Sequence, residues 1–233
     1  MPPSTGTSRD QILDAAELLM AEHGVDAVSL RDINQAAGQR NASSIQYHFG
    51  NRDGLLVAVV ARHMHEIDAE RNALLDELAA TGATDARART FDVVTALVQP
   101  LAARLATPSG RRYLRIVHQL LDRPLGGEAG APEHPAIDPS VLNRSLHRVS
   151  TELTASIKDL PPRVRAVRAA QVTSFMLRAL ADQARRIDVD GAGATGPPDL
   201  PNDLFTANLV DVLVAVLHAP ASERTARLAR RRR

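Results

Sequence analysis

The sequence predicts an all-α fold, and three observations lead to this prediction. The 233 residues are 44% hydrophobic but only 3% aromatic, so aliphatic side chains and alanine must fill the core. Segments rich in Ala and Leu, with few β-branched or aromatic clusters, favour helices. Residues that start and end helices recur along the chain, and no segment alternates with period two as a half-buried strand would.

The first forty residues predict two helices. Ser8-x-x-Gln11 is typical of a capping box, and apolar residues follow it at helical spacing until Gly24, which is a typical helix stop. Ser29-x-x-Asp32 predicts the start of a second, short helix that Gly38 ends. A tight turn follows this second helix.

Further helices are predicted after this turn. Asn41 is predicted as the N-cap of a third helix that reaches about Phe49, and Gly50 breaks it. Asn51 is predicted to cap a long fourth helix. Turn-rich segments separate the remaining predicted helices, which cover residues 84–106, 109–122, 140–158, 162–187 and 203–218.

The predicted elements divide the chain into three parts. These are a helix-turn-helix unit of three short helices at residues 1–55, a larger helical unit at 56–220, and an Arg-rich tail at 221–233. The tail carries six Arg against one Glu, a net charge of +5. A disordered, solubilising end is the favoured interpretation of the tail, and contact with nucleic acid or an acidic partner is the alternative.

Composition excludes several classes of protein and site. The chain has no Cys, so disulfides and thiolate metal sites are excluded. The N-terminus lacks the apolar core of a signal peptide, and the longest apolar runs are shorter than the roughly 20 residues that span a bilayer. We therefore expect a cytoplasmic protein with no membrane contact.

Two local motifs resemble binding sites, but the sequence around them does not support that function. Residues 191–196 match the dinucleotide pattern G-x-G-x-x-G, but no strand precedes them and no helix follows. His63 and His65 lie two apart, so they point to different sides of a helix, and for His63 with Glu66 a solvated face is favoured over a metal site. No G-x-S-x-G nucleophile motif is present. We expect no catalytic residues, no cofactor and no metal, and hence no enzyme.

The second and third predicted helices have the pattern of a helix-turn-helix, in which the second of the two enters the major groove of DNA. On the third helix, Ile45 and Phe49 share one face, whereas Gln46 and Tyr47 lie on the opposite one. Gln can pair with adenine, and an apolar ring can contact the thymine methyl group. This helix therefore has an apolar face for its own domain and a polar face for another molecule.

The chain resembles the TetR-type transcriptional regulators over about residues 8–60. The resemblance rests on the runs "ILDAAELLMAEHGVDAVSLRDINQAAG" and "SIQYHFGNRDGLL", which include the Tyr47, His48, Phe49 cluster followed by Asn51 and Arg52. It implies that Ser29, His48 and Arg52 bind phosphates and that Phe49 belongs to the core. The resemblance and the polar face of the third helix together predict these DNA-binding residues: Ser29, Arg31, Arg40, Asn41, Ser43, Ser44, Gln46, Tyr47, His48 and Arg52.

The sequence departs from the family pattern at two points on this surface. The turn "GQRN" is one residue longer than usual, and Gln46 stands where a tyrosine is most common. In addition, residues 1–55 have four Arg against seven acidic residues, a net charge of −3. A domain with this net charge cannot bind DNA through general electrostatic attraction to the phosphates. We therefore predict that the affinity for DNA depends only weakly on salt concentration.

The resemblance also implies that the helices after the fourth bind a small molecule and pair two subunits. The last two long helices have broad apolar faces that suit a four-helix dimer interface. An aliphatic pocket would favour an apolar or amphipathic effector. Candidates for its wall are Phe91, Tyr113, His118, Phe175 and Met176, although for each alone ordinary core packing is the favoured interpretation.

The sequence thus predicts a ligand-responsive regulator, a repressor that binds a pseudo-palindromic, double-stranded DNA operator as a homodimer. The alternative from another class is a small all-α enzyme or carrier with an apolar pocket. A third interpretation is a constitutive DNA-binding protein without an effector.

Overall fold

The computed structural model describes residues 7–39, 41, 43–81, 85–121, 144–158, 160–189 and 200–230. These residues form helices joined by turns and irregular segments, and no strand occurs among them. The all-α prediction is therefore confirmed. Residues 191–196 and 123–139, which are rich in Gly and Pro, and Arg40 lie outside the described residues.

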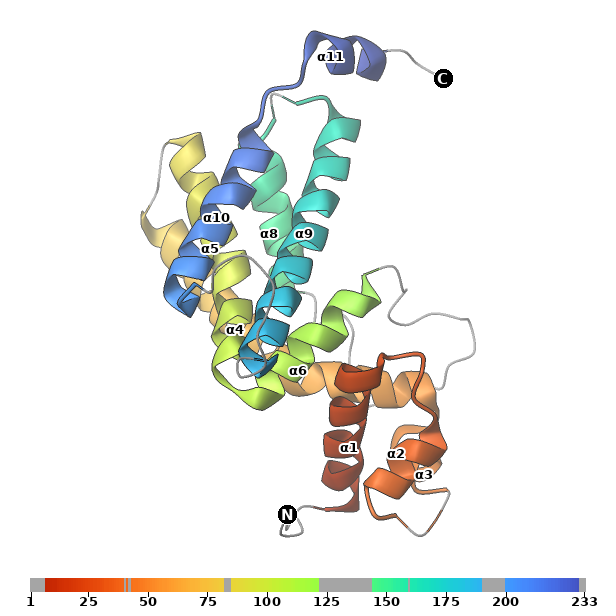
Figure 1. Cartoon of the computed structure of the whole chain (residues 1–233). Helices are drawn as coiled ribbons and strands as arrows, with labels where there is room; N and C mark the ends of the chain where they lie inside the picture. Colours follow the sequence, from red (N-terminus) through yellow and green to blue (C-terminus); the bar gives the residue numbers. More distant parts are fainter. Residues whose placement is uncertain are drawn as a thin grey trace.

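The N-terminal unit consists of three short helices, which lie together at one end of the molecule (Figure 1). They are α1 (Ser8–His23), α2 (Leu30–Ala36) and α3 (Ser44–Phe49). The N-cap of α1 was predicted one residue too late. Thr7, not Ser8, accepts a hydrogen bond from the Asp10 backbone, and the Asp10 carboxylate accepts one from the Thr7 N–H. The Ser8 hydroxyl instead donates to Gln39 Oε1 at 2.7 Å.

The capping box of α2 is confirmed. The Ser29 hydroxyl accepts from the Asp32 N–H, and the Asp32 carboxylate accepts from the Ser29 N–H, both at 3.1 Å. Asn41 is not the N-cap of α3, because its Oδ1 accepts from the Ser43 N–H at 2.9 Å in a turn that precedes the helix. Gly50 ends α3 with φ +75°, a left-handed conformation that a residue with a Cβ rarely adopts.

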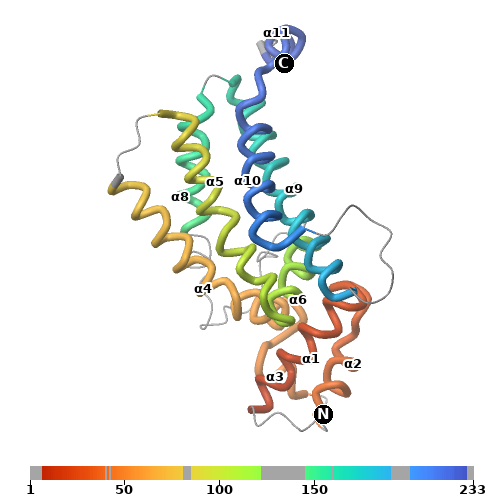
Figure 2. Tube along the Cα trace, turned by 60° about the vertical axis from the view of Figure 1, so that its left-hand side comes forward, coloured from red at the N-terminus to blue at the C-terminus, as the bar shows by residue number. Residues whose placement is uncertain are grey.

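The long helix α4 (Arg52–Thr81) runs from the N-terminal unit into the larger unit (Figure 2). Asn51 caps it as predicted, since its Oδ1 accepts from the Gly54 N–H at 2.8 Å. The helix continues through residues 55 and 56, where the sequence placed a domain boundary.

The remaining helices form the larger unit. They are α5 (Ala86–Ala102), the 3₁₀ turn η1 (Ala103–Ala106), α6 (Pro108–Val117), the 3₁₀ turn η2 (His118–Leu120), α8 (Arg144–Ser156), α9 (Pro162–Val189) and α10 (Asn202–His218). Helix α5 packs against α4, α8 and α10, and α6 packs against both α9 and α1. Helices α9 and α10 run side by side (Figures 1 and 2).

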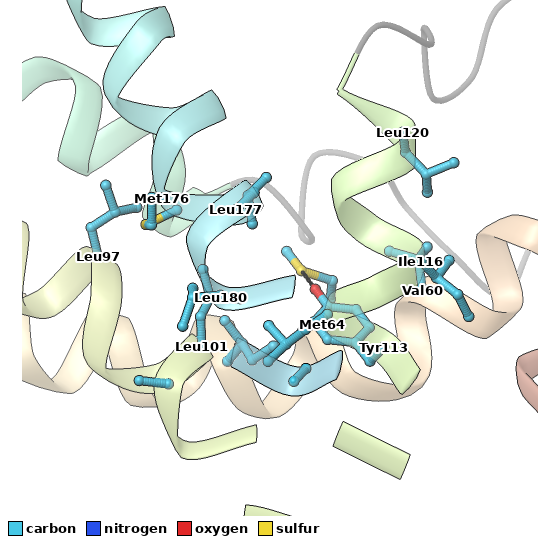
Figure 3. Close-up of a cluster of buried hydrophobic side chains, with 14 of the residues drawn as sticks. Val60, Met64, Leu97, Leu101, Tyr113, Ile116, Leu120, Met176, Leu177 and Leu180 are labelled. Atoms are coloured by element: carbon cyan, nitrogen blue, oxygen red, sulfur yellow. Dashed lines mark hydrogen bonds between the residues drawn. The ribbon is translucent and has the colours of Figure 1, made fainter. Parts of the chain in front are cut away.

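Aliphatic side chains fill the core of this larger unit, as the composition predicted. Figure 3 shows Leu97 and Leu101 of α5, Tyr113 of α6 and Leu180 of α9 in one buried cluster with Met64 of α4. Helix α6 extends from this cluster to α1. It therefore packs against both the core of the larger unit and the N-terminal unit.

A short helix, α11 (Glu223–Arg230), lies at the end of the molecule opposite α1–α3 (Figure 1). The sequence predicted a disordered tail here, and this prediction was wrong for residues 223–230. Ser222 caps this helix, since its Oγ accepts from the Thr225 N–H at 3.2 Å.

No single helix in the described ranges is long and apolar enough to cross a membrane. Among the described residues, one bent pair, α10 with residues 223–229 of α11 at an angle of 62°, has the length and composition of a membrane span.

Candidate nucleic-acid interface

Helix α3 presents two chemically different faces. Ile45 and Phe49 are buried against the N-terminal unit, whereas Gln46 is exposed and Tyr47 is 83% exposed. Ser43 is also exposed and Ser44 is half-buried. The structure thus brings these polar residues to one surface and confirms the core position predicted for Phe49.

The rings at the end of α3 contact one another. The ring centroids of Tyr47 and His48 lie 5.0 Å apart in an edge-on arrangement, and those of His48 and Phe49 lie 6.0 Å apart. Arg9 of α1 lies over the Phe49 ring, with its guanidinium carbon 5.3 Å from the centroid. This exposed cation beside α3 was missed at the sequence level, because nothing local indicates that residues 9 and 49 meet.

The turn between α2 and α3 is held by side-chain hydrogen bonds. Gln39 Nε2 donates to Gln11 Oε1 at 3.0 Å and to the Ala37 carbonyl at 3.2 Å, while its Oε1 accepts from Ser8. Asn41 is exposed and holds the last part of the turn. The longer turn is therefore tied to α1 by Gln39.

Ser29 and Arg31 lie exposed at the start of α2. The Ser29 hydroxyl donates to the Asp32 carboxylate at 2.6 Å. This hydrogen bond and a second one from the Ser29 backbone lower the pKa of Asp32. The hydroxyl is therefore engaged within the helix cap, and Arg31, whose charge also lowers the pKa of Asp32, is an exposed cation beside it.

Arg52 has a structural contact that sequence reasoning did not find. Its guanidinium donates to the carbonyl of Val28 at 2.6 Å and also to that of Val25. These carbonyls belong to the connection between α1 and α2, so Arg52 fixes that connection to the start of α4. The family resemblance implied that Arg52 binds phosphates, but no local sequence pattern indicated these carbonyls.

Comparison with known proteins agrees with this arrangement of the N-terminal helices. Residues 12–59 match the family described as bacterial regulatory proteins, tetR family. These residues therefore form the N-terminal helix-turn-helix domain of the TetR family. The chain is 37% identical over 67 residues to the HTH-type transcriptional repressor ComR of Escherichia coli strain K12, a match that spans 29% of this chain and 31% of ComR.

Solved structures extend the likeness to the fold of the whole chain. AmtR of Mycobacterium smegmatis has a TM-score of 0.51 and 20% identity, over 100% of this chain and 99% of AmtR. A TetR family transcription regulator from Shewanella sp. PV-4 also has a TM-score of 0.51, with 13% identity over 89% of this chain and 96% of that one. At these identities the likeness shows the fold, which is that of a TetR-family regulator with a helix-turn-helix domain and a larger helical domain.

A buried polar cluster joins the TetR-family helix-turn-helix domain to the larger domain. Glu17 of α1 is 1% exposed, and its carboxylate accepts from Ser109 Oγ at 2.7 Å and from Arg112 Nε at 3.0 Å, both of α6. His63 of α4 lies 3.2 Å from the other carboxylate oxygen. We call these four residues the Glu17 cluster.

The electrostatics of the Glu17 cluster favour a charged carboxylate. Burial alone would raise the pKa of Glu17, but hydrogen bonds from His63, Ser109 and Arg112 outweigh burial and lower it below its usual value. Ser109 and Glu17 both approach Nε2 of His63, so the imidazole cannot pass a proton from one to the other through opposite ring nitrogens. The cluster is therefore an ion-pair junction and not a nucleophilic triad.

A second contact joins the same two domains. Gln119 of η2 accepts from the Val25 N–H at 3.0 Å, directly after α1 ends at Gly24. Sequence reasoning missed both contacts, since the partners lie 46 to 95 residues apart in the chain. The only local signal was an acid, Glu17, among the buried positions of α1.

The predicted ligand residues do not form one wall. Tyr113 and Met176 are each 1% exposed within the core, but Phe91 and Phe175 are 43% and 50% exposed. His118 is half-buried, with Nδ1 3.1 Å from the Arg115 carbonyl. Helical position places Phe91 and Phe175 on outer faces of α5 and α9, which their apolar character did not indicate.

Proposed function

We propose that this TetR-family protein is a ligand-responsive repressor that binds a pseudo-palindromic DNA operator as a homodimer. The observation that carries the proposal is the polar face of α3, where the 83% exposed Tyr47 lies beside Gln46 while Ile45 and Phe49 anchor the helix. An aromatic side chain left in water on a helix of this kind suits the major groove, where the ring meets thymine methyl groups.

The surrounding residues support this surface in different ways. Gln46 and Tyr47 are proposed to contact bases, with Asn41, Ser43 and Ser44 beside them. Arg31 and the start of α2 at Ser29 are proposed to hold phosphates, which fix the position of the protein without reading sequence. His48 and Arg9 flank the same helix end. Arg40 completes the sequence-based set but lies outside the described residues.

The outer faces of α9 and α10 support the proposed dimer. Exposed apolar side chains follow both helices, at spacings of four and eight residues that place them on one stripe of each helix. They are Val167, Phe175, Leu204, Val212 and Val216. A second copy packed on these faces would bury them in a four-helix interface and present two α3 helices to two half-sites.

In this proposal the effector binds the larger domain, residues 56–220, and changes DNA affinity through the helix-turn-helix domain, residues 1–55. An effector that prefers one spacing of the two α3 helices shifts the population toward that spacing. The Glu17 cluster and the Gln119 contact supply a rigid path, because they bind α1 to α4, α6 and η2.

The test begins with selection of bound sequences from a random DNA pool, followed by mobility shift on the enriched site. We expect a two-fold symmetric site, and we expect Gln46→Ala with Tyr47→Ala to abolish specific binding while the circular dichroism spectrum stays unchanged. Gln99→Ala, an exposed Gln on α5, serves as the matched control and should bind normally. Failure to enrich any site, or full binding by the double variant, would contradict the proposal.

A further inference from the structure

Arg71 is a buried cation that forms no ion pair with any residue the structure describes. It lies on α4 and is 1% exposed. Its Nη1 donates to Ser145 Oγ of α8 at 3.0 Å, while its Nε has no hydrogen-bond partner. Within the described ranges, none of the ion pairs of this chain includes Arg71.

The nearest carboxylates are bound to other groups. Asp68 and Glu70 both act electrostatically on Arg71. Asp68 Oδ1 accepts from the Ser145 N–H and Oδ2 from Asn72, each at 2.9 Å, and Glu70 pairs with Arg104. Burial lowers the pKa of Arg71, so its surroundings do not compensate the charge fully. An incompletely paired charge in a protein interior is costly to stability.

Tyr113 is a second buried donor with a poor acceptor. It is 1% exposed and interacts electrostatically with Arg71. Its hydroxyl donates to the Met64 sulfur at 2.9 Å, a weak acceptor (Figure 3). Two donors at the edge of the apolar core thus lack a strong acceptor, and the acceptor that would satisfy both is an anion.

We propose that Arg71 and Tyr113 anchor the carboxylate of an amphipathic small molecule whose apolar part inserts into the core of the larger domain. A single guanidinium binds one carboxylate side by side through two N–H groups, and the phenol adds a third donor. Met64 and Met176 border this core, and such unbranched side chains rearrange readily to admit an apolar chain. The carboxylate site is argued independently of the proposed function. Only the identification of the bound molecule as the effector rests on that function.

The experiment measures binding without DNA, by calorimetry and thermal shift at pH 7.5. The probes are decanoate and its uncharged counterpart decanol, with octanoate, hexadecanoate and 4-phenylbutyrate as carboxylates of other shapes. We expect at least one carboxylate to bind, and decanoate to bind more tightly than decanol. Arg71→Met should weaken carboxylate binding by about tenfold to a hundredfold, as loss of a hydrogen bond to a charged group does, and leave decanol binding unchanged.

Two further variants separate binding from folding. Arg148→Met removes another arginine between α4 and α8, one that pairs with Asp76 at 2.7 Å, and it should keep the preference for carboxylates. Tyr113→Phe removes only the hydroxyl and should weaken decanoate several-fold but not decanol. It serves as the deciding variant if Arg71→Met does not fold.

Three results would overturn the proposal. These are equal affinity of the wild type for decanoate and decanol, an unchanged preference in the deciding variant, and no binding of any of the four carboxylates. Because no DNA is present, a chain that fails to bind an operator can still support the anchor. Conversely, a chain that binds no carboxylate can still recognise DNA through α3.

Discussion

At the scale of single residues, the carboxylate of Glu17 connects three helices. Its four nearest polar partners come from α4 and α6, and the side chain is almost completely buried. An acid in such a place stabilises the protein only while its partners remain, since a buried charge without them is costly. Glu17 is therefore the residue at which the contact between the two domains is most sensitive to substitution.

Glu17→Gln should lower the free energy of unfolding at pH 7 by about 2 kcal/mol, because hydrogen bonds to a charged group lose their ionic part. Urea denaturation measures this change. Glu22→Gln alters an acid of the same helix whose side chain is 50% exposed, and it should have little effect. Equal stability of the two variants would contradict the assignment of Glu17 as the junction.

The lowered pKa of Glu17 predicts how this difference depends on pH. A carboxylate with a lower pKa in the folded state stabilises it above the pKa of the unfolded chain, near 4.3, and loses that effect as pH falls through the folded value. The part of the stability difference that comes from the Glu17 charge should thus be lost as the pH falls below about 5. Asp10 and Asp32 also have lowered pKa values, but they are present in both proteins and cancel.

At the scale of elements, the junction of α3 and α4 depends on close backbone packing at Gly54. A Cβ atom at this position would lie 2.0 Å from the Phe49 carbonyl oxygen, which is closer than atoms can approach. The first turn of α4 therefore fits against the end of α3 only because residue 54 has no side chain.

Gly54→Ala should separate α3 from α4 and destabilise the fold by about 2 kcal/mol, in spite of the higher helix propensity of alanine. Asp53→Ala, at the exposed neighbouring position, is the control. Thermal denaturation followed by circular dichroism compares the two variants. A Gly54→Ala protein as stable as the wild type would show that the packing adjusts without cost.

The elements show how far the sequence could predict the structure. Caps and stops such as Ser29 with Asp32, or Gly50, follow local rules, so most bounds of the helices before α11 were predicted to within a few residues, whereas α11 itself was missed. The polar face of α3 followed from helical spacing alone. The Glu17 cluster and the burial of Arg71 could not be predicted, because they depend on which distant helices pack together. The exposure of Phe175 could not be predicted either, because an apolar residue type alone suggests a buried position.

At the scale of the whole molecule, the proposed dimer depends on apolar side chains that face away from the core. Phe175 of α9 is 50% exposed and Val212 of α10 is 36% exposed. Phe175→Asp should therefore convert a dimer into a monomer, as measured by light scattering, without loss of helicity. Leu18→Asp changes a side chain of α1 that is 41% exposed and should leave the dimer intact. A wild-type chain that is already monomeric at micromolar concentration would refute the proposed interface.

Charge distribution over the molecule predicts the salt dependence of DNA binding. Residues 1–55 carry a net charge of −3, and Arg52 donates to backbone carbonyls, so few cations can replace counterions. A plot of log K against log salt concentration should have a slope much shallower than −10. A slope near −10 would show that many more phosphate contacts form than the helix-turn-helix domain can supply.

The two tyrosines have an optical consequence, because the chain contains no Trp that would mask their emission. Tyr47 stands in water on α3, whereas Tyr113 is enclosed beside Arg71. Each of the two proposed binding events therefore has its own intrinsic fluorophore. Tyr47→Phe leaves Tyr113 as the single emitter and Tyr113→Phe leaves Tyr47, so titrations of DNA and of a carboxylate can be followed separately, without an attached dye.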